Sequence, residues 1–298
     1  MRLAHVRDDD GRVRLAVQRG DEWLDVAAAA GDEEVSTLAG LVAVGADEVL
    51  AGLEDGPVVD AGRRAAIAGA GTRIFCVGRN YVAHRDEFAN APTPWPEVFL
   101  RLDTSICGPY DDVDAPAVVA NLDYEGELAA IIGRGGRHIP AAAALEHVFG
   151  FAVANDISAR DWQWRGGQWT PGKNFDGTLP LGPEVVSPDE LRWDDALLQT
   201  TLNGEVVQSA RTSQFIFDLP TQIEFLSSWA TLRPGDVICT GTPGGVGSAR
   251  TPPRFLAPGD VVEVSIEGIG SIRNRIVSDP ATPATGRWRD VASSRPSD

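Results

Sequence analysis

The chain has 298 residues, 43% of them hydrophobic, and a formal net charge of −17 at pH 7 with a pI near 4.6. This length allows one large domain, or a large domain with a small one, and the apolar content is ample for a packed core. The acidic balance argues against nucleic acid and anionic membranes as partners, although local arginines can still bind an anionic substrate.

The N-terminus has no apolar stretch typical of a signal peptide, and no run of 18 apolar residues could form a transmembrane helix. We therefore expect a cytoplasmic protein that does not enter a membrane. The three cysteines, Cys76, Cys107 and Cys239, lack the spacing of a zinc site or a disulfide framework, which predicts buried, reduced thiols.

The first 70 residues predict a small N-terminal α/β domain or arm. Short alternating segments at Arg12–Gln18 and Glu22–Val26 indicate a hairpin, and Leu38–Leu53 has helical spacing. A Gly/Ala-rich stretch at 68–71 marks a plausible boundary.

From Ile74 onward, apolar runs separated by Gly, Pro and Asp turns predict a strand-rich domain over residues 71–284, and residues 285–298 predict a disordered tail. Asn203-Gly204 is a strong hairpin signal. Strands are expected at Asp236–Thr240 and Val261–Ile266, and a helix at Leu219–Trp229. The absence of regular strand–helix alternation makes a doubly wound parallel sheet an unlikely fold class.

Candidate functional residues begin with His84 and Glu87, which follow Arg79-Asn80-Tyr81. On one helical turn, residues three apart meet, and a carboxylate beside an imidazole can set its tautomer and make it a general base for water. The alternative is an exposed pair of no consequence.

Glu125 and Glu127 lie two apart in a strand-like segment, so both side chains project from the same face, followed by Ala129 and Ile131. Two adjacent anions above apolar neighbours are costly unless a cation joins them. Oxygen ligands favour Mg²⁺, Mn²⁺ or Ca²⁺ over zinc. Two solvated glutamates on an edge strand remain the alternative for this pair alone.

A third carboxylate, Asp156, ends the apolar run Phe149–Asn155. If a helix starts at Ile157, then Asp156, Arg160 and Gln163 share one face. Asp156 could instead serve only as the cap of that helix, and capping would not exclude metal binding.

Lys173 is the only lysine among 26 basic residues. A compact ammonium can fit a tight pocket that a planar guanidinium cannot, so its place in the segment Gly172–Gly177 indicates a site. The Gly-rich segment Thr240–Gly247 lacks the P-loop pattern, and it is either an ordinary turn or a loop whose amides approach a ligand.

Seven ordered motifs resemble the fumarylacetoacetate hydrolase family over roughly residues 73–276. They read VGRNYVAHRDE, YEGEL, VANDISARDWQ, GKNFDG, LNGEVVQ, GDVICTGTPGGVG and GDVVEVSIEGIGSIRN. The resemblance implies a strand-rich α+β fold, a mixed β-sandwich roll of the family's C-terminal domain type, and a homodimer.

The resemblance also assigns roles to residues. It implies a divalent metal, Mg²⁺ or Mn²⁺ with Ca²⁺ as a further candidate, on Glu125, Glu127 and Asp156. It implies catalytic roles for His84, Glu87 and Lys173. The substrate-binding residues that it implies are Arg79, Arg101, Arg160, Gln163 and Thr242, with Arg101 standing where many members have lysine.

The expected reaction is metal-dependent hydrolysis of a C–C bond in an acylpyruvate- or fumarylpyruvate-like 1,3-diketo acid, with His84 activating water. The same metal–enolate site would also suit an oxaloacetate decarboxylase or a 2-hydroxyhepta-2,4-diene-1,7-dioate isomerase. A noncatalytic ligand-binding accessory protein is the hypothesis from a different class, and the complete set of acidic and basic site residues speaks against it.

Overall fold

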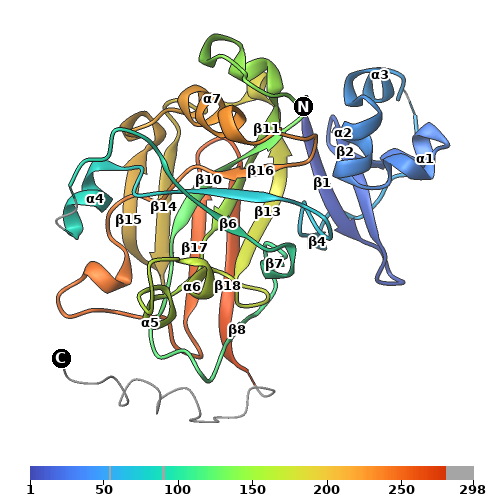
Figure 1. The fold of residues 1–298 in the computed structure, drawn as a ribbon. Helices are drawn as coiled ribbons and strands as arrows, with labels where there is room; N and C mark the ends of the chain where they lie inside the picture. The colour runs from blue at the N-terminus through green and yellow to red at the C-terminus, as the bar shows by residue number, and fades with distance from the viewer. Residues whose placement is uncertain (54, 89–90, 280–298) are drawn as a thin grey trace.

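The computed structural model describes residues 1–53, 55–88 and 91–279. Its elements form two large β-sheets and one two-stranded sheet, with short helices at their edges (Figure 1). This confirms the strand-rich α+β prediction. The predicted tail at 285–298 lies outside the described residues.

The larger sheet contains strands from the N-terminal residues and from the rest of the chain as far as β16. Its main path has the order β3-β2-β1-β13-β11-β10-β16-β5-β6, with β4 paired to β1 and β7 to β13. The strands are β1 (Arg2–Arg7), β2 (Val13–Arg19), β3 (Glu22–Asp25), β4 (Arg64–Ala65), β5 (Ile74–Gly78), β6 (Glu97–Arg101), β7 (Ile106–Cys107), β10 (Gly126–Ile132), β11 (Val148–Asn155), β13 (Leu179–Val186) and β16 (Val237–Cys239).

The second sheet has the order β15-β14-β17-β18-β8 and lies against the centre of the first. Its strands are β8 (Val113–Ala115), β14 (Leu197–Leu202), β15 (Glu205–Arg211), β17 (Val261–Ile266) and β18 (Gly270–Ser278). A two-stranded pair, β9 (Leu122–Asp123) with β12 (Ser158–Ala159), adjoins them. Most pairs are antiparallel, as expected for a fold without regular βαβ units.

Strand β10 separates two hydrophobic cores because its side chains alternate between the sheet's faces. Leu128, Ala130 and Ile132 pack with the second sheet and with helix α7 (Leu219–Trp229). Ala129 and Ile131 face the N-terminal part of the chain, as the predicted alternation requires. Gly126 lies so close to the second sheet that a Cβ atom there would stand 2.4 Å from Thr200 Oγ1.

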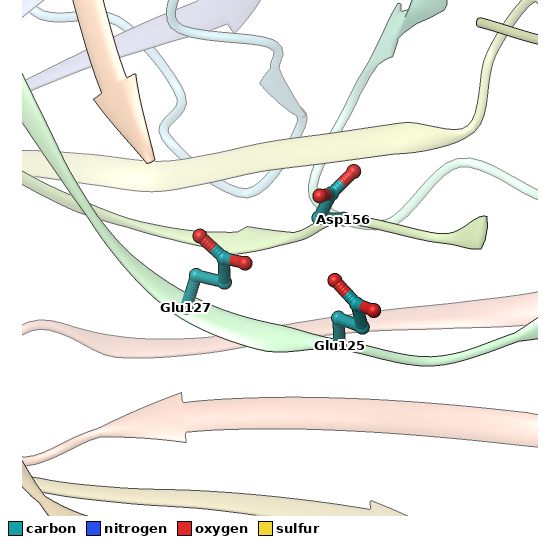
Figure 2. Close-up of side chains that lie close together, drawn as sticks. All are labelled: Glu125, Glu127 and Asp156. Carbon is teal, nitrogen blue, oxygen red and sulfur yellow. The ribbon is translucent and has the colours of Figure 1, made fainter. Parts of the chain in front are cut away.

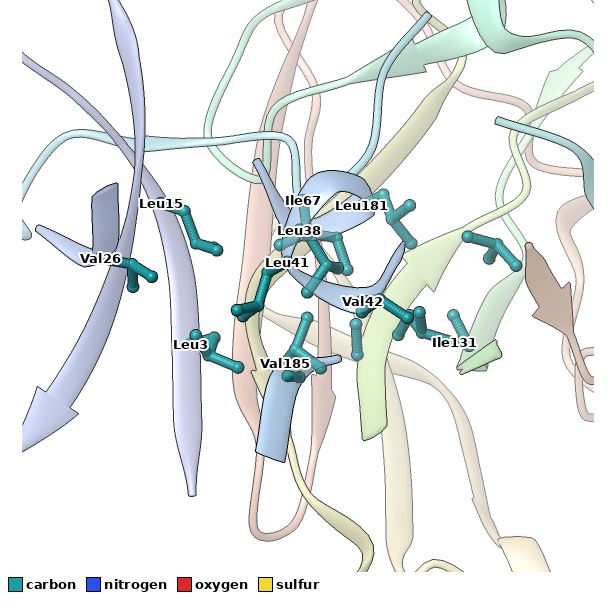
Figure 3. Close-up of a cluster of buried hydrophobic side chains, with 14 of the residues drawn as sticks. Leu3, Leu15, Val26, Leu38, Leu41, Val42, Ile67, Ile131, Leu181 and Val185 are labelled. Carbon is teal, nitrogen blue, oxygen red and sulfur yellow. The ribbon is translucent and has the colours of Figure 1, made fainter. Parts of the chain in front are cut away.

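The N-terminal residues share the core on the other face of the large sheet (Figure 3). Leu38, Leu41 and Val42 of α2 (Leu38–Val44) pack there with Leu181 and Ile131. The other N-terminal helices are α1 (Val26–Ala30) and α3 (Ala46–Ala51). Residues 1–70 thus contribute both strands and core side chains to the body that carries the site.

The local predictions agree with the structure in most elements. The hairpins at 13–25 and 197–211 form, and Asn203 and Gly204 have φ values of 53° and 85°, as a two-residue turn of this type requires. The helix expected at Leu38–Leu53 is two helices, α2 and α3, because Gly45 breaks it at φ 106°.

The predicted start of a helix at Ile157 was wrong. Ser158 and Ala159 pair with β9 instead, so helix α5 spans only Arg160–Gln163 and Asp156 does not cap it. Two further short helices border the same region, α4 (Val82–Glu87) and α6 (Thr170–Lys173).

Candidate active site

Glu125, Glu127 and Asp156 converge at one end of the β10–β11 pair (Figure 2). Each offers a carboxylate oxygen, and the three oxygens lie within 4.8 Å of one another. The backbone amide of Asp156 donates to Glu125 O at 2.8 Å, which fixes the third carboxylate beside the first. All three side chains are buried.

Three cationic side chains surround two of these carboxylates. Lys173 Nζ donates to Glu125 Oε2 and Asp156 Oδ2, both at 2.7 Å. Arg160 Nη1 lies 2.6 Å from Glu125 Oε1, and Arg101 pairs with Asp156 from the side away from the cavity. Burial alone would raise the pKa of Glu125, but the nearby charges of Lys173 and Arg160 outweigh it and lower this pKa to about 2.

Glu127 is different because it has no ion pair within the part of the chain that the structure describes. Its Oε2 accepts only the amide of Gly241, at 2.8 Å. Burial and the neighbouring charge of Asp156 raise the pKa of Glu127 well above its usual range. An oxygen-only, buried ligand set with one uncompensated carboxylate fits a hard divalent cation.

His84 and Glu87 meet on helix α4, as their spacing predicted. His84 Nδ1 lies 3.2 Å from Glu87 Oε2, and the His84 ring lines the cavity. With Nδ1–H donating to Glu87, the Nε2 atom of His84 is the nitrogen left to take a proton from a ligand. Glu87 Oε1 is held in turn by the amide of Gly245.

The Gly-rich loop after β16 binds protein carboxylates rather than lying free for a ligand. Its amides donate to Glu127, to Glu87 and, from Gly247 at 2.7 Å, to Asp123. Asp123 is fully buried and also accepts from Arg160 Nε at 2.8 Å. This one backbone segment therefore positions the candidate metal ligand Glu127, the His84–Glu87 pair through Glu87, and Asp123, which holds Arg160.

A cavity of about 280 Å³ opens over these groups. It contains most of the predicted substrate-binding residues, namely Arg79, Arg160, Gln163 and Thr242, together with Lys173. Arg101 is absent from its lining because its guanidinium is fully buried between Asp156, Ser105 and Thr178. In this structure Arg101 forms an ion pair with Asp156 and does not reach the cavity.

Several residues of the site were missed in the sequence. The aromatic wall of the cavity consists of Phe88, Phe99, Trp164 and Trp169. The two tryptophans flank Gly166-Gly167, a pattern that could have indicated a loop over a site. Gln208 was also missed, although it ends the quoted motif LNGEVVQ; its side chain donates to Thr242 Oγ1 at 2.9 Å.

Cys76 and Cys239 are buried and free, whereas Cys107 is only partly buried. Burial raises the pKa of Cys107 to about 12 and also raises that of Cys76, so neither is a ready thiolate. Within the described ranges, no helix has the length and apolar character to cross a membrane.

Comparison with protein families gives one match for most of the chain. Residues 73–277 match the fumarylacetoacetate (FAA) hydrolase C-terminal model. The human protein named oxaloacetate tautomerase FAHD2A, mitochondrial, is 48% identical over 209 residues, which is 69% of this chain and 66% of that protein. The matched part therefore spans just under two thirds of this relative.

Solved structures match nearly the whole chain. Fumarylacetoacetate hydrolase from the psychrophile Exiguobacterium antarcticum has a TM-score of 0.82 and 36% identity, covering 94% of this chain and 100% of that one. Maleylpyruvate hydrolase from Sphingobium sp. SYK-6 has a TM-score of 0.76 and 28% identity, covering 94% and 100%. The similarity thus includes the N-terminal residues that lie outside the family model.

Proposed function

We propose that this chain, which belongs to the fumarylacetoacetate hydrolase family, is a metal-dependent enzyme that interconverts the keto and enol forms of a 2-oxo acid, with oxaloacetate as its first candidate substrate. The observation that carries the proposal is the buried trio of Glu125, Glu127 and Asp156, of which the two glutamates line a cavity together with His84. The relatives named oxaloacetate tautomerases support the choice of substrate.

The metal would be held by the three carboxylates. It would compensate above all the charge of Glu127, which has no ion pair among the described residues. A divalent cation there supplies Lewis acidity that stabilises negative charge on the oxygen of a 2-oxo group. Mg²⁺ and Mn²⁺ are the candidates because all ligands are oxygen atoms.

The protein's own residues then bind the substrate and move the proton. Arg160 has a buried Nη2 without a hydrogen-bond partner, and this atom can donate to the carboxylate next to the 2-oxo group. His84 Nε2 takes the proton from C3, so that the C3–H bond breaks and a C2–C3 double bond forms. His84 then gives that proton to the oxygen on C2, which completes the enol. The reverse sequence restores the ketone.

Glu87 keeps His84 in the productive tautomer throughout, because its carboxylate accepts the Nδ1 proton. The aromatic wall excludes water from the region around C3. The negative charge that develops on the substrate as the proton leaves C3 therefore interacts more strongly with Lys173 and Arg160. No step needs a water molecule.

A second candidate is hydrolysis of an acylpyruvate. The His84–Glu87 dyad favours it, since the same Nε2 atom could deprotonate water instead of C3, and a maleylpyruvate hydrolase is among the similar structures. In that reaction hydroxide would add to the distal carbonyl, the C–C bond would break, and a carboxylic acid and pyruvate would form.

The experiment that separates these functions is a substrate panel with the purified chain. Enol-oxaloacetate and an acylpyruvate are each supplied with Mg²⁺ or Mn²⁺, and both enol absorbance and pyruvate release are followed. We expect metal-dependent ketonisation of oxaloacetate that exceeds pyruvate release. Equal ketonisation in the presence of EDTA would contradict the proposal, and preferential cleavage of the acylpyruvate would favour the second candidate.

A further inference from the structure

The rings of the aromatic wall differ in what they touch. Phe99 and Trp169 pack edge-on against each other, with ring centroids 5.5 Å apart. Each also faces a cation, since Lys173 Nζ lies 4.9 Å from the first centroid and Arg79 Cζ lies 5.2 Å from the second. The indole of Trp164 lines the same cavity, but within the described ranges it has no hydrogen bond, ring contact or cation contact. It is 57% exposed, which places it at the mouth of the cavity with a large apolar surface in water.

The backbone fixes Trp164 beside the polar residues of the site. Its amide donates to Arg160 O at 3.1 Å, so it continues directly from helix α5, which carries Arg160 and Gln163. Beyond it, Gly166 and Gly167 have open space where a Cβ atom would stand. Trp164 is therefore anchored through its backbone to the helix that holds Arg160, while its side chain remains largely in solvent.

The proposed proton transfer determines where a group on C3 of the substrate lies. His84 Nε2 takes the proton from C3, so a substituent on C3 lies beside the His84 ring. Phe88 lines the cavity there, and its ring stands edge-on to that of His84 with centroids 5.6 Å apart. The cavity volume of about 280 Å³ is close to the range of roughly 300–1,000 Å³ typical of sites for drug-sized ligands, which is more room than a three-carbon 2-oxo acid fills. A bulky apolar group on C3 therefore has both space and apolar surroundings.

We propose that Trp164 is a specificity-determining residue whose indole stacks on an aromatic group carried by C3 of the substrate. The site then binds 3-aryl-2-oxo acids more tightly than small 2-oxo acids. The inference rests on the proposed function for the placement of the 2-oxo acid end. Contact with a flat ring removes indole surface from water, and the pairing of two aromatic rings adds to the gain from that burial. Oxaloacetate would bind through the same 2-oxo acid end but without this contact.

The test compares phenylpyruvate with pyruvate, because the two share the 2-oxo acid end and differ only in the ring on C3. Calorimetry with the Mg²⁺-loaded protein gives the ratio of the two affinities, and exchange of the C3 protons in deuterated water gives kcat and KM. The variants are Trp164→Ala, Trp164→Phe and, as a control, Trp229→Ala. Trp229 is also exposed, at 47%, but its ring packs against Phe75 with centroids 5.9 Å apart and does not line the cavity.

We expect the wild type to bind phenylpyruvate roughly tenfold or more tightly than pyruvate. Trp164→Ala should lower this ratio roughly five- to tenfold, chiefly through the KM of phenylpyruvate, because the indole surface is lost. Trp164→Phe should retain most of the ratio, since it keeps a flat ring, and Trp229→Ala should leave it unchanged. Because Trp164 is exposed, neither of its variants should change Tm or the rise in Tm that Mg²⁺ produces.

A Trp164 with a structural role alone would give other results. Trp164→Ala would then weaken the binding of both compounds equally or leave the ratio unchanged, and either result overturns the inference. A wild type that binds phenylpyruvate and pyruvate with equal affinity overturns it as well. The proposed function fails separately, if the wild type binds these compounds but catalyses no Mg²⁺-dependent exchange of their C3 protons.

Discussion

Glu125, which directly precedes strand β10, and Glu127 within it should respond to the same substitution with opposite changes in the stability of the metal-free protein. Glu125→Gln removes a carboxylate whose pKa the ion pairs lower to about 2 from an ordinary value of 4.5. Glu127→Gln removes a carboxylate whose pKa burial and Asp156 raise. Both substitutions preserve side-chain size, so the contrast comes from charge.

The sign follows from the protons that each state binds. The depressed pKa of Glu125 contributes stability that is present above about pH 4.5 and lost as the pH falls toward 2. A shift of this size corresponds to about 3 kcal/mol, so metal-free Glu125→Gln should lose about 5 °C in Tm near neutral pH and much less in acid. The raised pKa of Glu127 has the reverse effect, because the unfolded chain ionises first and stability falls as the pH rises above 4.5. Metal-free Glu127→Gln should therefore have a higher Tm than the wild type near neutral pH.

The assay is thermal unfolding between pH 4 and pH 8, first in EDTA and then with Mg²⁺. Saturation at 100 times the dissociation constant stabilises a folded protein by about 2.7 kcal/mol, and we expect this gain in the wild type but not in Glu127→Gln. The reasoning is refuted if metal-free Glu127→Gln is less stable than the wild type at neutral pH, or if Mg²⁺ raises both Tm values equally.

Three further predictions concern catalysis. His84→Ala should lower the enolisation rate by roughly 10²–10⁴-fold while Mg²⁺ still raises Tm, and a rate within threefold of the wild type would remove His84 from the proton path. Lys173→Arg should cut kcat/KM despite its retained charge, because the buried ammonium contacts two carboxylates at 2.7 Å; wild-type kinetics would show that charge alone suffices. Gly245→Ala should lose activity, since a Cβ there would stand 2.1 Å from Val207 O and displace the amide that holds the dyad. The control Gly259→Ala has a similar φ of +98° but open space, so activity lost equally in both variants would assign the effect to backbone strain.

What could be predicted from the sequence was mostly local. Glu125 and Glu127 share a face because strand side chains alternate, and His84 and Glu87 meet because a helical turn brings residues three apart together. The convergence of Asp156 with them depends on the register that pairs Gly126 with Asn155. Spacing within either segment says nothing about that register, and only the family resemblance anticipated it.

The side chains whose positions the sequence did not indicate depend on tertiary packing. Arg101 ends strand β6 opposite Ile74, and this pairing turns its guanidinium into the interior beneath Asp156. The sequence around Arg101 showed that a positive charge was present, but it did not show which way the side chain points. Phe99 and Trp169 come from separate segments and form the cavity wall only where β6 and α6 meet.

The same packing explains why the chain has lysine at position 173 alone. One nitrogen atom donates to Glu125, which directly precedes β10, and to Asp156, which directly follows β11. An arginine carries a larger, planar fork with fixed donor directions, so it suits this contact of one nitrogen with two carboxylates less well. The space is also fixed, because a Cβ at the preceding Gly172 would stand 2.5 Å from the backbone nitrogen of Gln163. Helices α5 and α6 therefore pack closely at this glycine. We therefore expect position 173 to require the compact charge of lysine, which the Lys173→Arg variant tests.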